Sequence, residues 1–386
     1  MRYLAAFDKF KGSISANRAC EVAVAALGGG TAGRIVDACP LTDGGEGFAR
    51  ILTGAAGGSL SAIQVAGPRG ATVTASLGIV HSEKIPSAAR LRMGFAQEGA
   101  RVGVVEMAAA SGLELLSPGA RDPFYTTSQG TGELVEAAAR QGVDAILLGV
   151  GGSATHDLGL GALGALGLAY VSDSGNAIER IVPADWPWLA RIAGRLVSPL
   201  PPIFIACDVA NPLLGPTGAA AVYGPQKGLR HGDYARIERG SAKVSRLLCR
   251  HFERPESLAR EPGAGAAGGI AFGLMAAAGA RLLPGFDLVA AWLDLDARLA
   301  AADVVLTGEG RFDESSLSGK GPATLARRAL ALGKTVHVFA GQVVNVTQIP
   351  GLSVHEISPR GMPIDEALAG APSLLEAAIR ASFPRQ

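Results

Sequence analysis

Apolar runs alternate with helical patterns at both ends of the chain. The run at 3–7 precedes a helical pattern at 16–27, which Ser15 is placed to cap, and the run at 34–38 precedes a helical pattern that begins at Phe48. Such strand–helix alternation predicts a parallel sheet with crossover helices. The same pattern returns near the C-terminus, with strands expected at 303–306, 336–340 and 354–357 and helices at 322–333 and 374–382.

The pattern changes near residue 59, where three apolar strands follow one another with short connections. They are SLSAIQV, ATVTASLGIV and RVGVVEMA, and their spacing predicts an antiparallel meander. A strand at 145–150 is expected beside this meander, with a helix at 133–140. We therefore expect residues 1–58 and 284–386 to form one discontinuous α/β domain, into which residues 59–283 are inserted as a mixed α/β domain.

The composition argues against several classes of partner. With 386 residues, 48% of them hydrophobic, the chain can bury two cores. The 35 Lys and Arg residues nearly balance the 34 Asp and Glu residues, so no basic field favours nucleic acid or an anionic membrane. The four cysteines lack metal-type or disulfide-type spacing, and no apolar run has the length of a signal peptide or a membrane span. We expect a cytoplasmic protein, either a monomer or a homodimer.

The stretch at 144–167 has the pattern of an anion-binding turn. Its apolar strand breaks at Gly151 and Gly152, and Ser153 and a segment rich in Ala, Gly and Leu follow. Glycine lets a ligand approach the backbone, and the N–H groups at a helix N-terminus attract negative charge. Asp157 lies in the same stretch, and a carboxylate beside an anion usually requires a cation between them. The stretch therefore suggests a phosphate bridged by a metal ion.

Acidic residues follow five of the predicted strands. They are Asp8; Asp43 and Glu46; Asp157; Asp208; and Glu309 with Asp313. Ligands of open α/β sheets bind at the carboxyl ends of the strands, so we expect these acids to face one cleft between the two domains. Clustered carboxylates repel unless a cation or a proton lies among them, and phosphoryl transfer uses Mg²⁺, basic side chains and a carboxylate near the attacking hydroxyl. The basic residues close in sequence to these or neighbouring loops are Lys11, Lys227, Arg311 and Lys320.

Each of these residues also has a simpler interpretation. An Asp at a glycine turn is more often a turn-former or a helix cap than a ligand, and a Lys is by default a solvated surface residue. His156 is a general base, a surface residue or an orienting residue beside Asp157. The chain has no GxxxxGK[ST] sequence, and its GxGxxG matches lie in the wrong context for a dinucleotide site. These patterns therefore exclude a P-loop enzyme and disfavour a dinucleotide-binding one.

Several segments resemble, in the same order, the sequence blocks of one family, the type-1 glycerate kinases. The blocks are DKFKGSISA (8–16), PLTDGGEG (40–47), EMAAASGL (106–113), TSQGTGEL (127–134), GVGGSAT (149–155) followed by Asp157, ACDVANPLLGPTGAAAVYGPQKG (206–228), PGAGAAGG (262–269) and TGEGRFD (307–313). The similarity extends from residue 8 to beyond residue 320, so it covers nearly the whole chain.

The resemblance implies ATP-dependent phosphorylation of D-glycerate with Mg²⁺, with 2-phosphoglycerate favoured as the product. It also implies a flavodoxin-like domain formed by both chain ends, a restriction-endonuclease-like mixed-sheet domain between them, and an active site in the cleft between the two. The implied partners are D-glycerate and ATP, with no nucleic acid and no membrane. Two alternatives stay open: a kinase for another small hydroxy acid, and a non-catalytic protein that binds glycerate or a nucleotide.

The resemblance also implies a set of site positions, and the chemistry of phosphoryl transfer suggests their roles. The expected catalytic residues are Lys11, Asp157, Asp208 and Lys320, of which the lysines neutralise phosphate charge. The expected substrate- or nucleotide-binding residues are Asp8, Asp43, Glu46, Gly151, Gly152, Ser153, Asn211, Glu309 and Asp313. The expected Mg²⁺ ligands are Asp43, Asp208 and Glu309.

The chain departs from the family pattern at three positions. Lys9 replaces the usual Ser and adds a charge beside the expected phosphate site. His156 and Leu158 stand where the family usually has Asn or a small apolar residue and then Gly. Leu158 should cost backbone freedom at a position where glycine is usual.

Overall fold

The structure is a computed structural model that describes residues 1–28, 33–95, 97–196, 200–313, 321–344 and 349–384. It divides into two compact units, Met1–Asp43 with Val289–Gln386, and Gly44–Leu288. The division falls after residue 43, where the sequence led us to expect it near residue 59. The reason is helix α2 (Phe48–Ala55), which packs against strands of the second unit.

The first unit contains a five-stranded parallel sheet. Its strands are β1 (Arg2–Ala5), β2 (Ile35–Ala38), β11 (Val304–Asp313), β12 (Thr335–Val344) and β13 (Leu352–Glu356). They lie in the order β13-β12-β11-β1-β2. Numbered along this unit alone, that is the 2-1-3-4-5 order of flavodoxin-like folds, whose ligands bind outside the carboxyl ends of the strands at the switch point between the first and third strands. Here the switch point lies between β1 and β11.

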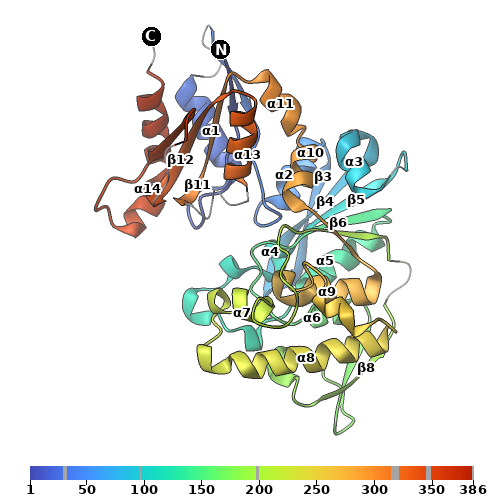
Figure 1. The fold of residues 1–386 in the computed structure, drawn as a ribbon. Coiled ribbons are helices and arrows are strands. Elements are labelled where there is room, and N and C mark those ends of the chain that lie inside the picture. Colours follow the sequence, from blue (N-terminus) through green and yellow to red (C-terminus); the bar gives the residue numbers. More distant parts are fainter. Residues whose placement is uncertain (29–32, 96, 197–199, 314–320, 345–348, 385–386) are drawn as a thin grey trace. The chain divides into compact units, whose positions relative to one another are not determined.

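Helices cover both faces of this sheet (Figure 1). Helices α1 (Ala16–Leu27) and α14 (Ile364–Ser382) pack against each other on one face, and α11 (Leu295–Ala301) and α13 (Pro322–Ala331) lie on the other. The Ser15 hydroxyl caps α1, as the sequence predicts, by accepting a hydrogen bond from the Arg18 backbone N–H at 3.3 Å. Helix α14 begins at Ile364, well before the start expected at residue 374, and it continues through Pro372.

The second unit contains a six-stranded mixed sheet, and this confirms the predicted meander. Strands β3 (Ser59–Ala66), β4 (Thr72–His81) and β5 (Arg101–Glu106) are antiparallel neighbours. Strands β6 (Ala145–Gly149), β9 (Ile203–Ala206) and β10 (Arg281–Leu283) then continue the sheet in parallel with β5. The full order is β10-β9-β6-β5-β4-β3. With its parallel and mixed sheets in two units, the structure confirms the predicted α/β fold class.

Helices cover this second sheet in layers (Figure 1). On one face, α5 (Gln129–Arg140) packs on β3, β4 and β5 beside α4 (Met107–Ser111). Four further helices and a β-hairpin belong to the same unit. These are α6 (Leu160–Ala165), α7 (Ala219–Tyr223), α8 (Tyr234–His251), α9 (Ala266–Ala278) and the hairpin of β7 (Leu168–Ser172) with β8 (Leu189–Gly194). Helix α2 packs on β3, β4 and β5. Helix α3 (Ser87–Met93) also belongs to this unit, and α10 (Gly285–Trp292) begins in this unit and ends in the first.

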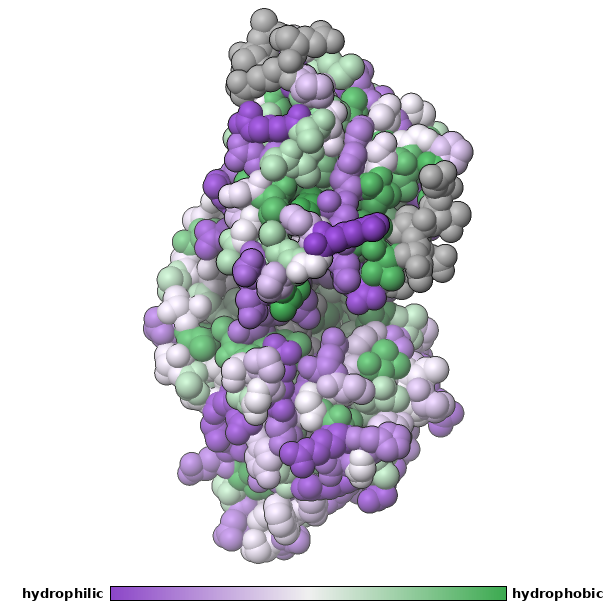
Figure 2. All heavy atoms as spheres, turned by 90° about the vertical axis from the view of Figure 1, so that its left-hand side faces the viewer, coloured by the Kyte–Doolittle hydropathy of each residue, from purple (hydrophilic) through white to green (hydrophobic). Residues whose placement is uncertain are grey.

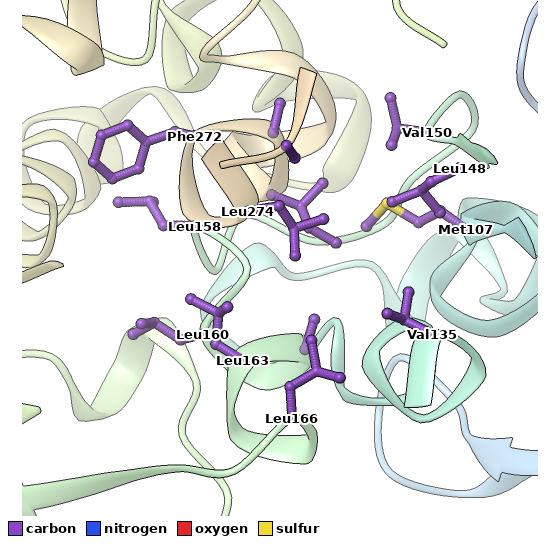
Figure 3. Close-up of a cluster of buried hydrophobic side chains, with 14 of the residues drawn as sticks. Met107, Val135, Leu148, Val150, Leu158, Leu160, Leu163, Leu166, Phe272 and Leu274 are labelled. Carbon is purple, nitrogen blue, oxygen red and sulfur yellow. The ribbon is translucent and has the colours of Figure 1, made fainter. Parts of the chain in front are cut away.

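The core of the second unit is formed by aliphatic side chains from the sheet and from α5, α6 and α9. Leu148, Val135, Leu163 and Leu274 are all buried in one cluster, which Figure 3 shows in close-up. The backbone that enters α6 contributes Leu158, and α9 contributes Phe272 to the same cluster. The segment between β6 and α6 is therefore anchored to the core through the Leu158 side chain.

The surface carries no extended apolar face in the view of Figure 2, where hydrophilic side chains are interspersed with smaller hydrophobic groups. Within the described ranges, no helix has the length and apolar character needed to cross a membrane.

Candidate active site

Three carboxylates lie after β1, after β2 and on the part of β11 that extends beyond its pairing with β1, all in the first unit. Asp8 follows β1, Asp43 follows β2, and Glu309 lies within β11. Burial raises the pKa of the Asp8 carboxyl to about 8, with further contributions from the negative charges of Asp43 and Glu309, while the positive charge of Lys9 opposes them. The structure therefore brings these three predicted acids together at the switch point of the sheet.

Strand β11 is longer than the sequence suggested. It was expected to end at residue 306, but pairing with β12 continues as far as Asp313, which lies opposite Val344. Glu309 and Asp313 are thus strand residues, and the loop expected at that point is an extension of the sheet. The apolar run ends at Leu306 because the following residues are glycines and charged residues, a composition that predicts a turn.

The Asp8 carboxylate accepts a backbone hydrogen bond and lies beside the N-cap of α13. Its Oδ1 atom accepts a hydrogen bond from the Lys9 N–H at 2.7 Å. Its Oδ2 atom lies near Gly321, the N-cap of α13, where an added Cβ would lie 3.5 Å away. Lys11, on the segment after β1, is exposed. Lys320 lies outside the described residues, and only the backbone of Asp313 is described.

The carboxylates of Asp8, Asp43 and Glu309 supply hard oxygen donors of the kind that Mg²⁺ prefers. In the described part of the chain, no three His, Cys, Asp or Glu side chains form a group able to hold a metal ion by themselves. In kinase sites, however, Mg²⁺ is usually bound by one or two carboxylates together with substrate phosphates. The donor chemistry fits an ion of that kind.

In the second unit, two glycine-rich segments pack backbone to backbone. The Gly151 N–H donates to the Gly44 carbonyl at 3.0 Å. An added Cβ on Gly151 would lie 2.8 Å from the backbone of Gly45, and one on Gly149 would lie 2.5 Å from the Gly44 carbonyl oxygen. Only glycine fits these close approaches. The turn after β6 is therefore packed directly against the loop that carries the exposed Glu46.

A buried lysine lies behind the Gly151–Ser153 turn. Lys227 is 2% exposed and its Nζ donates to the Ser153 hydroxyl at 2.8 Å and to the Thr155 carbonyl at 2.7 Å. Burial lowers the pKa of Lys227 to about 7, and the negative charge of Asp157 acts in the opposite direction. From the sequence, Lys227 was by default expected to be a solvated surface residue. Its position between Gly224 and Gly228, which lets the chain turn inward, was the available signal.

Asp157 is fully buried, and its oxygens accept four hydrogen bonds. Oδ2 accepts from the Ser128 N–H and hydroxyl, both at 2.7 Å, and from the Gly161 N–H at 3.1 Å, while Oδ1 accepts from the Gly159 N–H at 3.1 Å. Burial raises the pKa of Asp157, and these hydrogen bonds oppose that rise. The geometry favours an anchoring role and argues against the direct contact with metal or hydroxyl that the sequence suggested.

The two unusual neighbours of Asp157 both face the core. The Nε2 atom of His156 lies 3.0 Å from the Ser241 hydroxyl, which itself donates to the Ile237 carbonyl, so Nε2 carries the hydrogen. Burial lowers the pKa of His156 to about 3, which makes it a neutral core residue and a poor general base. Leu158 has φ +54°, so the expected backbone cost is present. Its buried side chain contributes to the cluster in Figure 3.

Asp208 and Asn211 follow β9, and their side chains bond to neighbouring loops. Both Asp208 oxygens accept from the Phe286 N–H, at 3.1 and 2.9 Å, at the start of α10. The Asn211 amide donates to the Thr217 carbonyl at 2.8 Å and accepts from the Tyr223 hydroxyl at 2.6 Å. Both side chains therefore organise the segment after β9.

Comparison with known proteins gives one consistent result. The family model described as "Glycerate kinase family" matches residues 3–383. The chain is 36% identical over 348 residues to a glycerate kinase of Halalkalibacterium halodurans, covering 88% of this chain and 86% of that protein. It is 34% identical over 385 residues to the glycerate 2-kinase of Escherichia coli (strain K12), covering 96% and 94%.

A solved structure also resembles this chain. The crystal structure of a Salmonella typhimurium LT2 protein assigned as glycerate kinase 2 matches with a TM-score of 0.75 and 34% identity, over 99% of this chain and 97% of that one. The parallel sheet with its acidic switch point, the paired glycine turns and the family match over residues 3–383 lead to one conclusion: the chain belongs to the glycerate kinase family.

Proposed function

We propose that this chain transfers the γ-phosphoryl group of ATP to a hydroxyl of D-glycerate and forms 2-phosphoglycerate. The family membership supports the reaction class. The observation that carries the proposal for this chain is the group of Asp8, Asp43 and Glu309 at the switch point, because burial raises the pKa of Asp8 to about 8 and the negative charges of the other two carboxylates add to that rise. Phosphoryl transfer needs a carboxylate that positions the attacking hydroxyl and accepts its proton.

Asp8 is the residue to which we assign proton transfer. A general base works best when its pKa lies near the working pH, and Asp8 meets this condition. The glycerate hydroxyl oxygen bonds to the γ-phosphorus while the bond from that phosphorus to the bridging oxygen of ADP breaks. The hydroxyl proton passes to the Asp8 carboxylate. Lys11, exposed on the same segment, is assigned to the charge on the phosphates.

Asp43 and Glu309 are the residues that would hold Mg²⁺, together with phosphate oxygens. The ion would neutralise negative charge on the transferred group. For Asp208, the two bonds to the Phe286 N–H support a positioning role at the start of α10.

The test is the release of ADP from ATP and Mg²⁺, measured with D-glycerate and with a panel of other small hydroxy acids. We expect release that depends on D-glycerate, and a fall in kcat of about 10²- to 10⁴-fold in Asp8→Asn. Asp303→Asn is the matched control, since Asp303 also accepts one backbone N–H, from Arg2 at 2.8 Å, at the opposite end of β11. ADP release that is independent of D-glycerate, or that prefers another hydroxy acid, contradicts the proposed substrate.

A further inference from the structure

The lysine behind the Gly151–Ser153 turn has no evident stabilising purpose. An ammonium group loses its hydration when it is buried, and replacing a buried ion by an apolar side chain of similar volume is often neutral or stabilising. Lys227 is 2% exposed. Its two hydrogen bonds and the nearby charge of Asp157 offset part of the cost. A lysine retained at such a position calls for a role beyond packing.

The direction of the hydrogen bonds suggests that role. In its protonated form Lys227 only donates, so the Ser153 oxygen accepts from it, and the hydrogen of the Ser153 hydroxyl is directed to another partner. The bond to the Thr155 carbonyl holds the backbone on the other side of Ser153. Both contacts fix the turn and increase the polarity of its one hydroxyl.

The position of Ser153 gives this hydroxyl access to a ligand. It follows β6 at the carboxyl end of the parallel part of the sheet, the edge at which α/β proteins bind their ligands. Ser153 itself is 7% exposed, and Gly152 beside it is exposed. Ser153 is thus a buried residue next to an exposed residue of the same turn, and the Lys227 ammonium lies 2.8 Å from its hydroxyl.

We propose that Lys227 is a positioning residue that acts through Ser153, whose polarised hydroxyl donates to an anionic oxygen of a bound substrate. This inference deepens the proposed function and rests on it. The anionic oxygen belongs either to the carboxylate of the acceptor acid or to a phosphate of the nucleotide. Lys227 does not touch the ligand, because Ser153 and the turn lie between them.

The test is a double-mutant cycle of Lys227→Met and Ser153→Ala, measured by calorimetric titration with D-glycerate and, separately, with ADP. We expect each single variant to weaken the binding of the same one of these probes by about 10- to 100-fold, the range for a hydrogen bond to a charged group. Because Lys227 acts through Ser153, the double variant should bind no more weakly than Ser153→Ala alone. Weaker binding of D-glycerate identifies the acceptor carboxylate, and weaker binding of ADP identifies a phosphate.

Lys243→Met is the matched control. Lys243 also donates two hydrogen bonds to carbonyls, those of Trp186 and Pro187, both at 2.9 Å, but it lies on α8. Its loss should leave both dissociation constants unchanged. If Lys227→Met does not fold, Ser153→Ala carries the test alone, with reduced affinity and an unchanged melting temperature as the expected result.

Three results would overturn the inference. They are dissociation constants within twofold of the wild type in Ser153→Ala, losses that multiply in the double variant, and a wild-type protein that binds neither probe. Failure of the proposed function is recognised separately. A wild-type protein that binds a probe through Lys227 and Ser153 but forms no phosphoglycerate upholds the inference and refutes the reaction.

Discussion

The substitution Asp157→Asn separates an anchoring role from a catalytic one. An Asn side chain keeps one oxygen, which can accept the three hydrogen bonds that Oδ2 receives, from the Ser128 N–H, the Ser128 hydroxyl and the Gly161 N–H. Its NH₂ group then faces the Gly159 N–H, and because both groups are hydrogen-bond donors, that hydrogen bond is lost. The variant loses one hydrogen bond and weakens three more.

The magnitude follows from the strength of such bonds. A hydrogen bond to a charged group contributes about 1.5–3 kcal/mol, and removing the buried charge returns part of its desolvation cost, so we expect a loss of about 3 kcal/mol. At 2–4 °C per kcal/mol, the usual range for a unit of this size, the melting temperature should fall by about 6–12 °C. In protein assayed well below its melting temperature, kcat should stay within about tenfold of the wild type, because Asp157 is placed outside the reaction.

Differential scanning calorimetry and steady-state kinetics on the same preparations measure both quantities. The control is Asp144→Asn, because Asp144 accepts one backbone hydrogen bond, from the Arg101 N–H at 2.8 Å. This substitution should lower the free energy of unfolding by about 1 kcal/mol. An unchanged melting temperature together with a kcat reduced by orders of magnitude would refute the anchoring role and restore Asp157 as a catalytic residue.

Three further predictions address the proton acceptor, the strained backbone and the histidine pair. If Asp8 is the base, kcat/KM should rise with pH through about 8 as its carboxyl loses the proton, and a profile that is flat between pH 6 and 9 would remove it from that role. Residue 158 has φ +54°, which is strained for Ala as for Leu but not for Gly. Calorimetry should therefore find Leu158→Gly more stable than Leu158→Ala by about 1 kcal/mol. The reverse order would mean that the backbone strain is absent. His337 Nδ1 lies 3.0 Å from His355 Nε2, and burial together with the His355 charge lowers the pKa of His337 to about 4. Because His337 has its usual, higher pKa in the unfolded chain, the unfolded chain binds the proton at a higher pH than the folded protein does. Denaturant titrations should therefore show the free energy of unfolding decreasing as pH falls from about 6.5 towards 4, with a smaller decrease in His337→Phe. An equal dependence of the free energy of unfolding on pH in both proteins would contradict this.

The sequence predicted the fold to a large extent, because hydrophobic periodicity and glycine turns are local signals. The cap at Ser15, the meander from residue 59 and the place of the strand at 145–150 beside that meander all follow from short stretches of the chain. The extension of β11 could not be predicted in this way. It depends on pairing with β12, to which glycines and charged residues give no local clue.

The site was predictable in residue type and less so in role. The sequence placed Asp8, Asp43 and Glu309 at strand ends, and the effect of Asp43 and Glu309 on the pKa of Asp8 follows from the strand order, which needs tertiary structure. Asp157 and His156 have the composition of active-site residues, but long-range partners, Ser128 and Ser241, take up their polar atoms. Lys227 was least accessible to prediction, because only the folded chain shows that a lysine between glycines turns inward.

The central claim is that the chain phosphorylates D-glycerate at the expense of ATP. Phosphorus NMR of the purified protein with ATP, Mg²⁺ and D-glycerate measures this directly, because the phosphate monoester, ADP and inorganic phosphate give separate signals. We predict equal growth of the ADP signals and of one monoester signal that coincides with authentic 2-phosphoglycerate. A monoester signal at the 3-phosphate position would contradict the assigned product. Growth of inorganic phosphate alone, or no change in ATP, would contradict the claim itself.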